Sequence, residues 1–434
     1  DVYKRQLMER ERINSLLGRR EDQINDLRLA DRVAKTMGKP EMIATVKKEL
    51  ANYNGQIGDY QKAIQFAREA IAIAEEHDLI EVQASARNIW ANCARHQGDY
   101  QVSREQSKLG IQLSKQSDNL IGVCIGLSAL ALTASDQGNY TEAIEYLKQN
   151  LATAQETRDI NLEAQAMNNL GNMYGDLGDL STAYEYYVLG LDLARKKGNR
   201  MGEGLVNTNL GWVTGLLGDY GTARQHLEES IRTARVIGDI YNHAYSLVNM
   251  SLVSTSLGDF QQAEEAVKEA LAILTEAGHT PGIAIAWTYL GHVQLAEDKL
   301  EEARESYANG LKLREELKQE NLAMEPLAGL ADIARRTEGA QQAMAHVGRI
   351  LAHLEADGNL SGIDQPFRVY ATCGKILTEV GHPDTRRFIQ NAYDFLQIQA
   401  ANIKDPKWRN SYLNNVTCHR EMIQLYQEHI QQTQ

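Results

Sequence analysis

The sequence predicts an all-α solenoid of stacked helical hairpins, and three observations support this fold class. A glycine turn recurs every 40 residues, apolar columns keep the same register, and the apolar spacing is helical on both sides of each turn. A repeat of this length cannot bury its apolar face alone, so neighbouring repeats must stack. The turns are Gly58-Asp59, Gly98-Asp99, Gly138-Asn139, Gly178-Asp179, Gly218-Asp219 and Gly258-Asp259.

Two columns of residues follow this 40-residue period without a break. Large apolar residues occupy the first column: Leu50, Trp90, Leu130, Leu170, Leu210, Met250, Leu290 and Leu330. Small residues occupy the second column, which we expect at close helix contacts: Ala63, Ser103, Ala143, Ala183, Ala223, Ala263, Ala303 and Ala343.

Each repeat contains two helices joined at its glycine. Leu170, Tyr174 and Leu177 follow the i, i+4, i+7 spacing of one helix face upstream of the turn. Gly178 suits the left-handed residue that ends a helix, and Asp179 can cap the next helix by accepting a backbone N–H. A second breaker, such as Gly198-Asn199, closes the repeat.

These residues resemble the tetratricopeptide (TPR) signature. The similar positions, spread over an unusually long repeat, are Asn169-Leu170-Gly171, Tyr174, Gly178-Asp179, Ala183, Tyr187 and Gly190-Leu191. The resemblance implies a right-handed superhelical solenoid of about ten repeats. Such repeats are typical of protein-interaction scaffolds and of sensor regions in multidomain bacterial signalling ATPases or transcriptional regulators. The tail around Trp408 and Tyr412 to Val416 resembles the end of those sensor regions.

The period also predicts how the chain divides. Residues 1–37 are expected to form a degenerate first repeat, 38–360 the regular array, and 361–434 an irregular last repeat followed by one capping helix over 407–430. The opening residues Asp1–Gln6 do not fit the repeat, so we expect them to mark a truncation point or a scar. The chain is therefore expected to be part of a larger protein.

Composition indicates a soluble helical chain and excludes several classes of function. The formal net charge of −13 argues against binding to a phosphate backbone, so a DNA-binding or ATPase module would lie outside this segment. No apolar run reaches the roughly 18 residues that a membrane span needs. Because no signal peptide is visible and the cysteines lack metal or redox spacing, a cytoplasmic location is expected. These cysteines are Cys93, Cys124, Cys373 and Cys418.

No catalytic or cofactor signature is present, so the chain is predicted not to be an enzyme and to need no cofactor. Gly202-Glu203-Gly204 is a fragment of a phosphate-loop pattern, but it follows no predicted strand and fits a junction between helices better. His226 and His243 lie in separate helices without ligand partners four residues away, so no metal site is expected.

The resemblance implies that the first helix of each hairpin lines a concave groove. In one repeat the corresponding stripe contains Gln165, Asn168, Asn172, Gly175 and Asp176, which share one helix face. The same columns elsewhere include Lys48, Asn52, Asn88, Asn92, Thr208, Trp212, Leu216, Tyr245, Leu252, Thr255 and His292. The stripe is amide-rich at first and becomes aromatic and aliphatic in the middle of the array.

Ten of these residues are the predicted ligand-binding set: Lys48, Asn52, Asn88, Asn92, Gln165, Asn168, Asn172, Thr208, Trp212 and Tyr245. Amides can donate to and accept from an extended peptide backbone, and Trp212 can anchor a side chain. The alternative for the amides is a solvated face, and for Trp212 it is packing between neighbouring first helices. Lys48, Asn52 and Asn92 also resemble part of a carboxylate clamp, but the next repeat has Ser128 and Leu132 where further cations are expected.

The sequence therefore predicts a non-catalytic scaffold or sensor that binds a protein or an extended peptide in this groove. The alternative is a sensor for a small molecule, such as a sugar or metabolite stacked on Trp212 and Tyr245. A peptide would need the amide half of the groove, whereas a metabolite would need mainly the aromatic middle.

Overall fold

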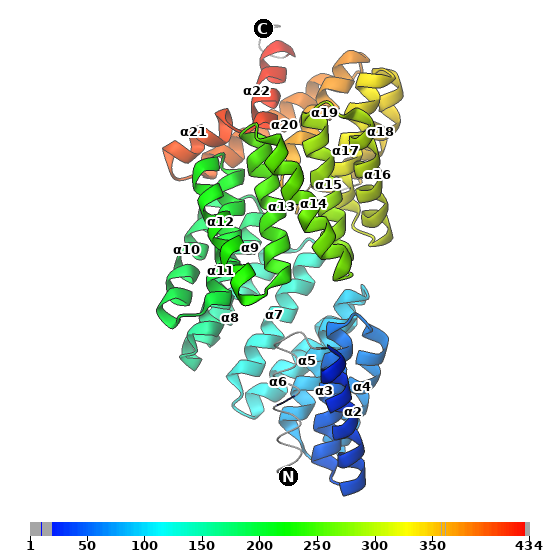
Figure 1. Cartoon of the computed structure of the whole chain (residues 1–434), viewed down its shortest axis with the longest axis vertical. Coiled ribbons are helices and arrows are strands. Elements are labelled where there is room, and N and C mark those ends of the chain that lie inside the picture. The colour runs from blue at the N-terminus through cyan, green and yellow to red at the C-terminus, as the bar shows by residue number, and fades with distance from the viewer. Residues whose placement is uncertain (1–9, 11–19, 357, 361, 430–434) are drawn as a thin grey trace. The chain divides into compact units, whose positions relative to one another are not determined.

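The predicted all-α class is confirmed by the computed structural model, which describes residues 10, 20–356, 358–360 and 362–429. The expectations for Asp1–Gln6 and for the start of the first repeat concern residues outside this part. Figure 1 shows helices as the regular elements of the described chain. They are α2 (Arg20–Met37), α3 (Pro40–Gln56), α4 (Tyr60–Glu76), α5 (Ile80–His96), α6 (Tyr100–Gln116), α7 (Leu120–Asp136), α8 (Tyr140–Thr157), α9 (Ile160–Asp176), α10 (Leu180–Lys197), α11 (Arg200–Leu216), α12 (Tyr220–Ile237), α13 (Ile240–Ser256), α14 (Phe260–Glu276), α15 (Thr280–Ala296), α16 (Leu300–Glu316), α17 (Glu320–Thr337), α18 (Ala340–Glu355), α19 (Pro366–Glu379), α20 (Thr385–Asn402), α21 (Pro406–Asn414) and α22 (Thr417–His429).

The predicted turns between paired helices are confirmed. Gly178 has a φ of 81°, in the left-handed region, and the backbone N–H of Asp179 closes the turn on the carbonyl of Tyr174. The Asp179 carboxylate then accepts from the backbone N–H of Thr182 and caps α10. Asp298 takes the left-handed conformation where the repeat has lost its glycine. The turn of the hairpin therefore keeps its left-handed conformation where aspartate replaces the recurring glycine.

The predicted column of small residues lies at close helix contacts. Every alanine of this column is fully buried, and so is Ser103, whose hydroxyl lies 2.8 Å from the Thr133 hydroxyl. Serine is accepted there because its polar atom has a partner inside the packed interface.

The chain forms two compact units, residues 1–166 and 167–434. The boundary falls inside α9, where the 40-residue repeat shows no interruption. In the first unit, successive hairpins from α3 to α8 pack against each other, and α2 shares a core with α3. The predicted division at residues 37 and 360 stays a prediction.

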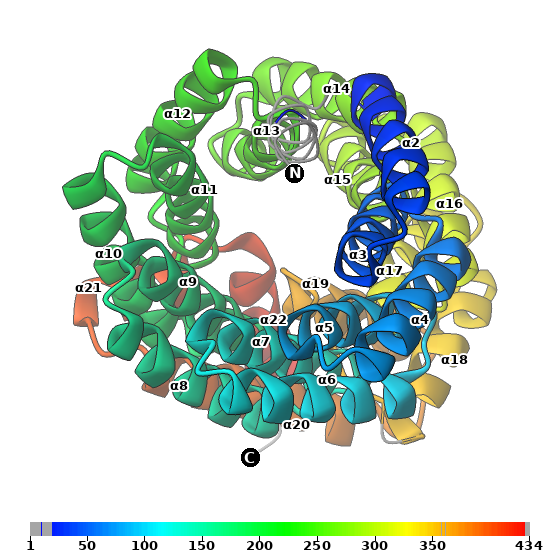
Figure 2. The same ribbon diagram turned by 90° about the horizontal axis from the view of Figure 1, so that it is seen from below.

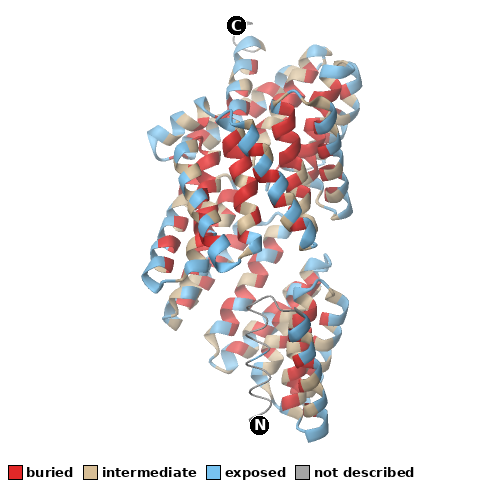
Figure 3. Ribbon diagram, viewed as in Figure 1, coloured by how far each residue is buried: buried red, intermediate tan, exposed pale blue. Residues whose placement is uncertain are grey.

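The second unit buries its first helices much more fully than its second helices. α11, α13 and α15 have buried residues on most sides because each lies between two neighbouring hairpins, whereas α12 and α14 bury a single face. Figure 3 shows this contrast as nearly continuous burial along the first helices. Much of the predicted stripe in this unit is consequently in contact with protein.

The C-terminal segment, residues 362–429, packs back onto the earlier repeats of its own unit. Figure 2 shows α19 and α22 on the inner side of the curve that α10 to α18 follow. Lys404 N–H donates to the Ser181 hydroxyl at 3.1 Å, and the Trp408 indole N–H donates to the Asp219 carboxylate at 3.3 Å. One hydrophobic cluster joins the two regions: it includes Leu191, Leu210, Val213, Phe367, Leu396, Met422 and Leu425.

The single terminal helix expected over 407–430 is wrong. Two helices, α21 and α22, occupy this range, and the chain between them carries Asn415 and Val416. The break has a physical role, because Asn415 donates to the Gly218 carbonyl at 3.0 Å and Val416 is buried in the shared cluster. A continuous helix could not place both residues against the repeat.

Candidate functional site

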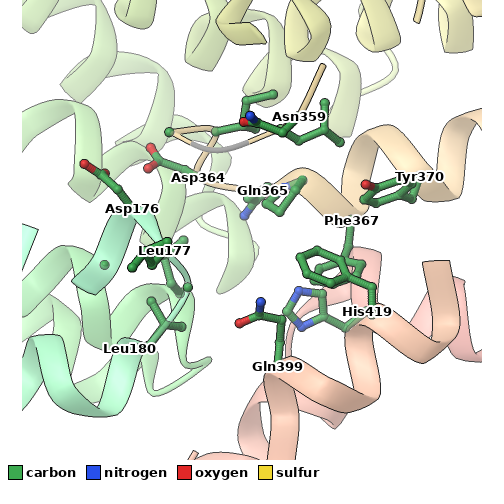
Figure 4. Close-up of a pocket in the computed structure, with 18 of the residues that line it drawn as sticks. Asp176, Leu177, Leu180, Asn359, Asp364, Gln365, Phe367, Tyr370, Gln399 and His419 are labelled. Carbon is green, nitrogen blue, oxygen red and sulfur yellow. The ribbon is translucent and has the colours of Figure 1, made fainter. Parts of the chain in front are cut away.

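A cavity of about 380 Å³ lies in the second unit, and we call it the acidic chamber. The repeat helices supply one wall, with residues from the end of α9 and from α11. The C-terminal segment supplies the other, with the chain before α19 and residues of α19, α20 and α22. The lining includes Asp176, Leu177, Leu180, Trp212, Leu216, Asn359, Asp364, Gln365, Phe367, Tyr370, Phe395, Gln399 and His419. Figure 4 shows how ten of the lining residues face the cavity.

A glycine in α9 makes room for the aromatic wall. A Cβ atom on Gly175 would lie 2.6 Å from the ring of Trp212, so the indole can pack here only because the glycine lacks a side chain. The packing fixes the direction of the indole N–H, which donates to Asp364 at 2.8 Å. The Trp212 side chain is therefore both a wall of the chamber and an anchor for the segment before α19.

Two carboxyl groups enter the same chamber. Asp364 accepts hydrogen bonds from the Trp212 indole and from the Tyr289 hydroxyl. No residue in the described part of the chain donates a hydrogen bond to the Asp176 side chain, whose carboxyl group lies beside that of Asp364 in Figure 4. Asp176 thus presents its acceptor atoms to the cavity.

The pKa values of both carboxyl groups reflect this enclosed setting. Burial, with the nearby Asp364 charge, raises the pKa of Asp176 to about 7. Burial and the Glu325 charge raise the pKa of Asp364 to about 6, although the hydrogen bonds from Tyr289 and Trp212 oppose the rise. The chamber therefore holds negative charge near neutral pH at an energetic cost.

Two further polar side chains have fixed orientations at the chamber wall. The Arg368 guanidinium donates to the Gln365 side-chain oxygen at 2.7 and 3.0 Å, which leaves the Gln365 amide nitrogen on the chamber side. His419 Nδ1 donates to the Tyr412 carbonyl at 2.7 Å, so Nε2 is the acceptor nitrogen of this ring. Burial lowers the pKa of His419 to about 4, which keeps the imidazole neutral.

A second cavity, of about 290 Å³, adjoins the first, and we call it the basic chamber. The two chambers share Gln365 and Val416 as lining residues. Three cations line the basic chamber: Arg336, which pairs with Asp332 at 2.7 Å, Lys375, which pairs with Glu421 at 3.0 Å, and Arg368. The partner carboxylates Asp332 and Glu421 also line this cavity, so Arg368 is its one described cation that no lining carboxylate pairs with.

A buried hydrogen-bond chain supports the wall of the basic chamber. His292 Nε2 donates to Glu325 at 3.0 Å, and His292 Nδ1 accepts from the Tyr307 hydroxyl at 2.7 Å. Burial raises the pKa of Glu325, but the hydrogen bond from His292 and the charges of Arg368 and Arg314 outweigh this effect and lower it overall. Burial and the Arg368 charge lower the pKa of His292. The pair is thus a neutral imidazole and a carboxylate.

The predicted ligand-binding residues of the first unit differ in exposure. Asn92 and Gln165 are exposed, and Lys48 and Asn52 are half-buried, with Lys48 paired to Glu49 at 2.6 Å. Asn88 is buried, donates to the Gly122 carbonyl at 3.2 Å and lies against Gly110. Asn88 therefore holds α5, α6 and α7 together, and a ligand role for this set stays a prediction.

The predicted residues of the second unit mostly contact neighbouring helices. Asn209 donates to Asn168 at 2.8 Å and to Asn172 at 3.3 Å, and Tyr187 also donates to Asn172.

Thr208 is buried among polar side chains of α12 and α13, and Tyr245 lies edge-on to His279, with ring centroids 6.1 Å apart. Of the ten, only Trp212 is among the described residues that line either chamber. Ligand binding by the other members of the set stays a prediction.

The helical stripe nevertheless identified one side of both chambers. Its members Gly175, Asp176, Trp212 and Leu216 line the acidic chamber, and Leu252, Thr255 and His292 line the basic one. The opposite side was missed, because Asp364, Gln365, Arg368 and His419 lie where the 40-residue period has ended. Their one sequence signal was the dense mixture of aromatic and polar residues after residue 363.

The described residues contain no group of three or more histidine, cysteine or acidic side chains arranged to hold a metal ion. All four cysteines are buried thiols, and burial raises the pKa of Cys373 to about 12. Among the described helices, none combines the length and the apolar character needed to span a lipid bilayer.

Comparison with known proteins identifies the repeat. A sequence profile of the tetratricopeptide repeat matches residues 122–196, 162–235, 203–276 and 241–316, and a second profile of this repeat matches residues 49–77. No curated protein matches the chain.

Several solved structures share the fold at low sequence identity. A Rap protein complexed with Competence and Sporulation Factor has a TM-score of 0.53 and 16% identity, over 90% of this chain and 99% of that chain. NprR in complex with its cognate peptide NprX has a TM-score of 0.55 and 15% identity, over 79% and 99%. A STAND signal transduction ATPase with a tetratricopeptide repeat sensor, from Pyrococcus horikoshii, has a TM-score of 0.50 and 16% identity, over 73% of this chain and 50% of that one.

Proposed function

Because the chain belongs to the tetratricopeptide repeat family, we propose that it is a non-catalytic receptor for a peptide or an extended protein segment. The observation that carries this proposal is the acidic chamber, where repeat helices and the C-terminal segment meet around a cavity of about 380 Å³. Aromatic walls and a few oriented polar groups are the usual composition of a recognition site. Two of the similar structures are complexes with a factor or a peptide, which agrees with this choice of ligand.

In this proposal the ligand holds the C-terminal segment and the repeats together. The acidic chamber takes one side chain and the basic chamber an anionic group of the same ligand, since the two cavities adjoin at Gln365. Ligand binding would then stabilise the packing of α19 to α22 on α10 and α11. A fused signalling module outside this segment, as the sequence resemblance implies, would respond to that change.

A small-molecule sensor is the second candidate. A cavity of about 380 Å³ lies within the range of roughly 300–1,000 Å³ that is common for small-ligand sites, and the side chains of Trp212, Phe367, Tyr370 and Phe395 line it. A metabolite would occupy the acidic chamber alone, whereas a peptide would reach both chambers.

A random peptide library, panned against the immobilised chain, tests the proposed function. Selected peptides are titrated against Leu177→Trp, which adds bulk to a half-exposed residue of the acidic chamber. Leu257→Trp is the matched control, since Leu257 holds the same repeat position and lies outside both chamber linings. We expect Leu177→Trp to weaken binding at least about tenfold and Leu257→Trp to leave it unchanged. A failure to select any binding peptide would contradict the proposal, and native mass spectrometry of a bound metabolite would favour the alternative.

A further inference from the structure

The acidic chamber lacks a counter-ion for its carboxyl groups among the residues that line it. Asp176 and Asp364 both face the cavity, and its described lining contains no lysine or arginine. Besides Asp176 of α9, the charged groups that act on the pKa of Asp364 are Glu325 of α17, which raises it, and Arg314 of α16, which lowers it. Arg314 is buried and donates to Gln319 at 2.5 Å, and it does not line the chamber. A cation inside the chamber would have to come from a ligand.

Two mostly buried polar side chains at the chamber wall each leave one atom open to the cavity. Gln365 is 8% exposed and His419 4% exposed, and each uses one polar atom within the protein. The other atoms, the Gln365 amide nitrogen and His419 Nε2, have no hydrogen-bond partner among the described residues, and both side chains point toward the cavity in Figure 4. Both atoms are open to the cavity: His419 Nε2 can accept from a cationic donor, and the Gln365 amide can donate to an acceptor elsewhere on the ligand.

The remaining walls suit a cation with an apolar stem. Trp212, Phe367, Tyr370 and Phe395 contribute aromatic surface, and Leu180 and Leu216 contribute aliphatic surface. Aromatic faces attract ammonium and guanidinium groups through their quadrupole, most strongly where water is excluded. The carboxylates, the His419 acceptor and these faces all favour the same ligand charge.

We propose that the acidic chamber binds a cationic nitrogen group on an apolar stem, as carried by an arginine or lysine side chain of the ligand. The inference rests on the proposed peptide function for the source of the cation, but the site chemistry stands on its own. Asp176 provides the direct ion pair, because it has no donor in the described protein. Asp364 adds a second carboxyl group to the chamber, and hydrogen bonds from Trp212 and Tyr289 hold its side chain in place.

Two probes separate the charge of the ligand from its shape. n-Butylguanidinium carries the proposed group on a short stem, and n-butylurea is its neutral counterpart. We expect calorimetry or ligand-observed NMR to show that the full chain binds the guanidinium at least about tenfold more tightly. Equal binding of the two probes, or no binding of either, would overturn the inference.

The matched variants are Asp176→Asn and Asp192→Asn. Asp192 lies on α10 of the same unit, where it is exposed and pairs with Lys196 at the surface. We expect Asp176→Asn to remove the preference for butylguanidinium and Asp192→Asn to keep it. If Asp176→Asn does not fold, the pH dependence of butylguanidinium binding to the wild-type chain provides the test. The affinity should rise between pH 6 and pH 8 as the carboxyl group ionises, and an affinity that does not change with pH would count against the ion pair.

Peptide selection distinguishes this inference from the proposed function. We expect peptides selected by the wild type to be enriched in arginine or lysine at one position, and this enrichment to disappear with Asp176→Asn. Peptides that bind without a cationic preference would overturn the inference and leave the proposed function intact. Butylguanidinium binding that depends on Asp176, with no peptide binding at all, would uphold the inference and refute the peptide function.

Discussion

Asp176 is the residue whose environment most strongly determines which ligand charge the acidic chamber favours. Its pKa is raised to about 7 by burial and by Asp364, so ionisation in the free protein opposes folding. A folded pKa above the unfolded value means that the folded state binds more protons between about pH 4 and pH 7, and stability falls as pH rises through that window. A bound cation would reverse this penalty.

We therefore predict that Asp176→Asn stabilises the ligand-free protein at high pH. At pH 8 the free energy of unfolding of the second unit should rise by about 1–3 kcal/mol, because the neutral amide has no ionisation cost. At pH 4 wild type and variant should be similar, since the wild-type carboxyl is then protonated. Urea denaturation at both pH values measures the difference, and a variant less stable than wild type at pH 8 would show that Asp176 has an internal partner.

Trp212 gives a second test at the scale of a single residue. Trp212→Phe keeps an aromatic ring but removes the hydrogen bond to Asp364, which then has one side-chain donor in place of two. This loss should lower the free energy of unfolding by about 1–3 kcal/mol and raise the pKa of Asp364 further. Trp287→Phe is the control, because the Trp287 indole makes no hydrogen bond to a described residue. Thermal melts of both variants measure the cost, and equal losses would deny the hydrogen bond any role.

At the scale of helices, the sequence predicted the regular hairpins well because each repeat carries its own signals. The glycine turn, the aspartate cap and the alanine column are local, so Gly178, Asp179 and Ala183 define a hairpin without long-range information. The packing of α19 to α22 on α10 and α11 could not be predicted in this way. It depends on contacts such as Asn415 to Gly218, which join residues about 200 positions apart and leave no periodic pattern.

Helix packing around Tyr307 supports a prediction about glycine within helices. The ring of Tyr307 in α16 is fully buried between Gly291 of α15 and Gly329 of α17, and a Cβ atom on Gly329 would overlap it. Gly329→Ala should therefore destabilise the protein by about 1–3 kcal/mol. Gly221→Ala, on the exposed face of α12 with open space around it, should stabilise by about 0.5–1 kcal/mol through helix propensity. Chemical denaturation should show changes of opposite sign in the free energy of unfolding for the two variants. If both variants were stabilised, the close packing of Tyr307 against Gly329 would be contradicted.

The C-terminal helices should be energetically part of the repeats that they cover. Met422 of α22 is fully buried in the cluster that also contains Leu210 and Val213 of α11. Met422→Ala should cost about 2–5 kcal/mol and lower hydrogen-exchange protection in α11 as well as in α22. Gln424→Ala, on the exposed side of α22, is the control and should change neither helix. Unchanged protection of α11 in Met422→Ala would mean that the segment folds independently.

At the scale of the whole chain, the sequence identified the kind of protein more securely than the location of its site. The stripe on the first helices included Asp176 and Trp212, which line the acidic chamber, but it also included Thr208 and Asn168, which are buried between helices. Helical periodicity shows which residues share a face. It does not show what covers that face, and in the second unit the C-terminal segment covers part of it.

The central claim is that a ligand binds in the second unit between the repeats and the C-terminal segment. The most direct measurement is photo-crosslinking of a selected peptide that carries a photoreactive group next to its arginine or lysine, followed by mass-spectrometric mapping. We predict crosslinks at the turn after α9, in α11 and in α19, next to Leu177, Trp212 and Tyr370, and their loss when excess butylguanidinium is added. Crosslinks confined to the first unit, around Asn52 and Asn92, would contradict the claim and favour the amide-rich part of the predicted groove.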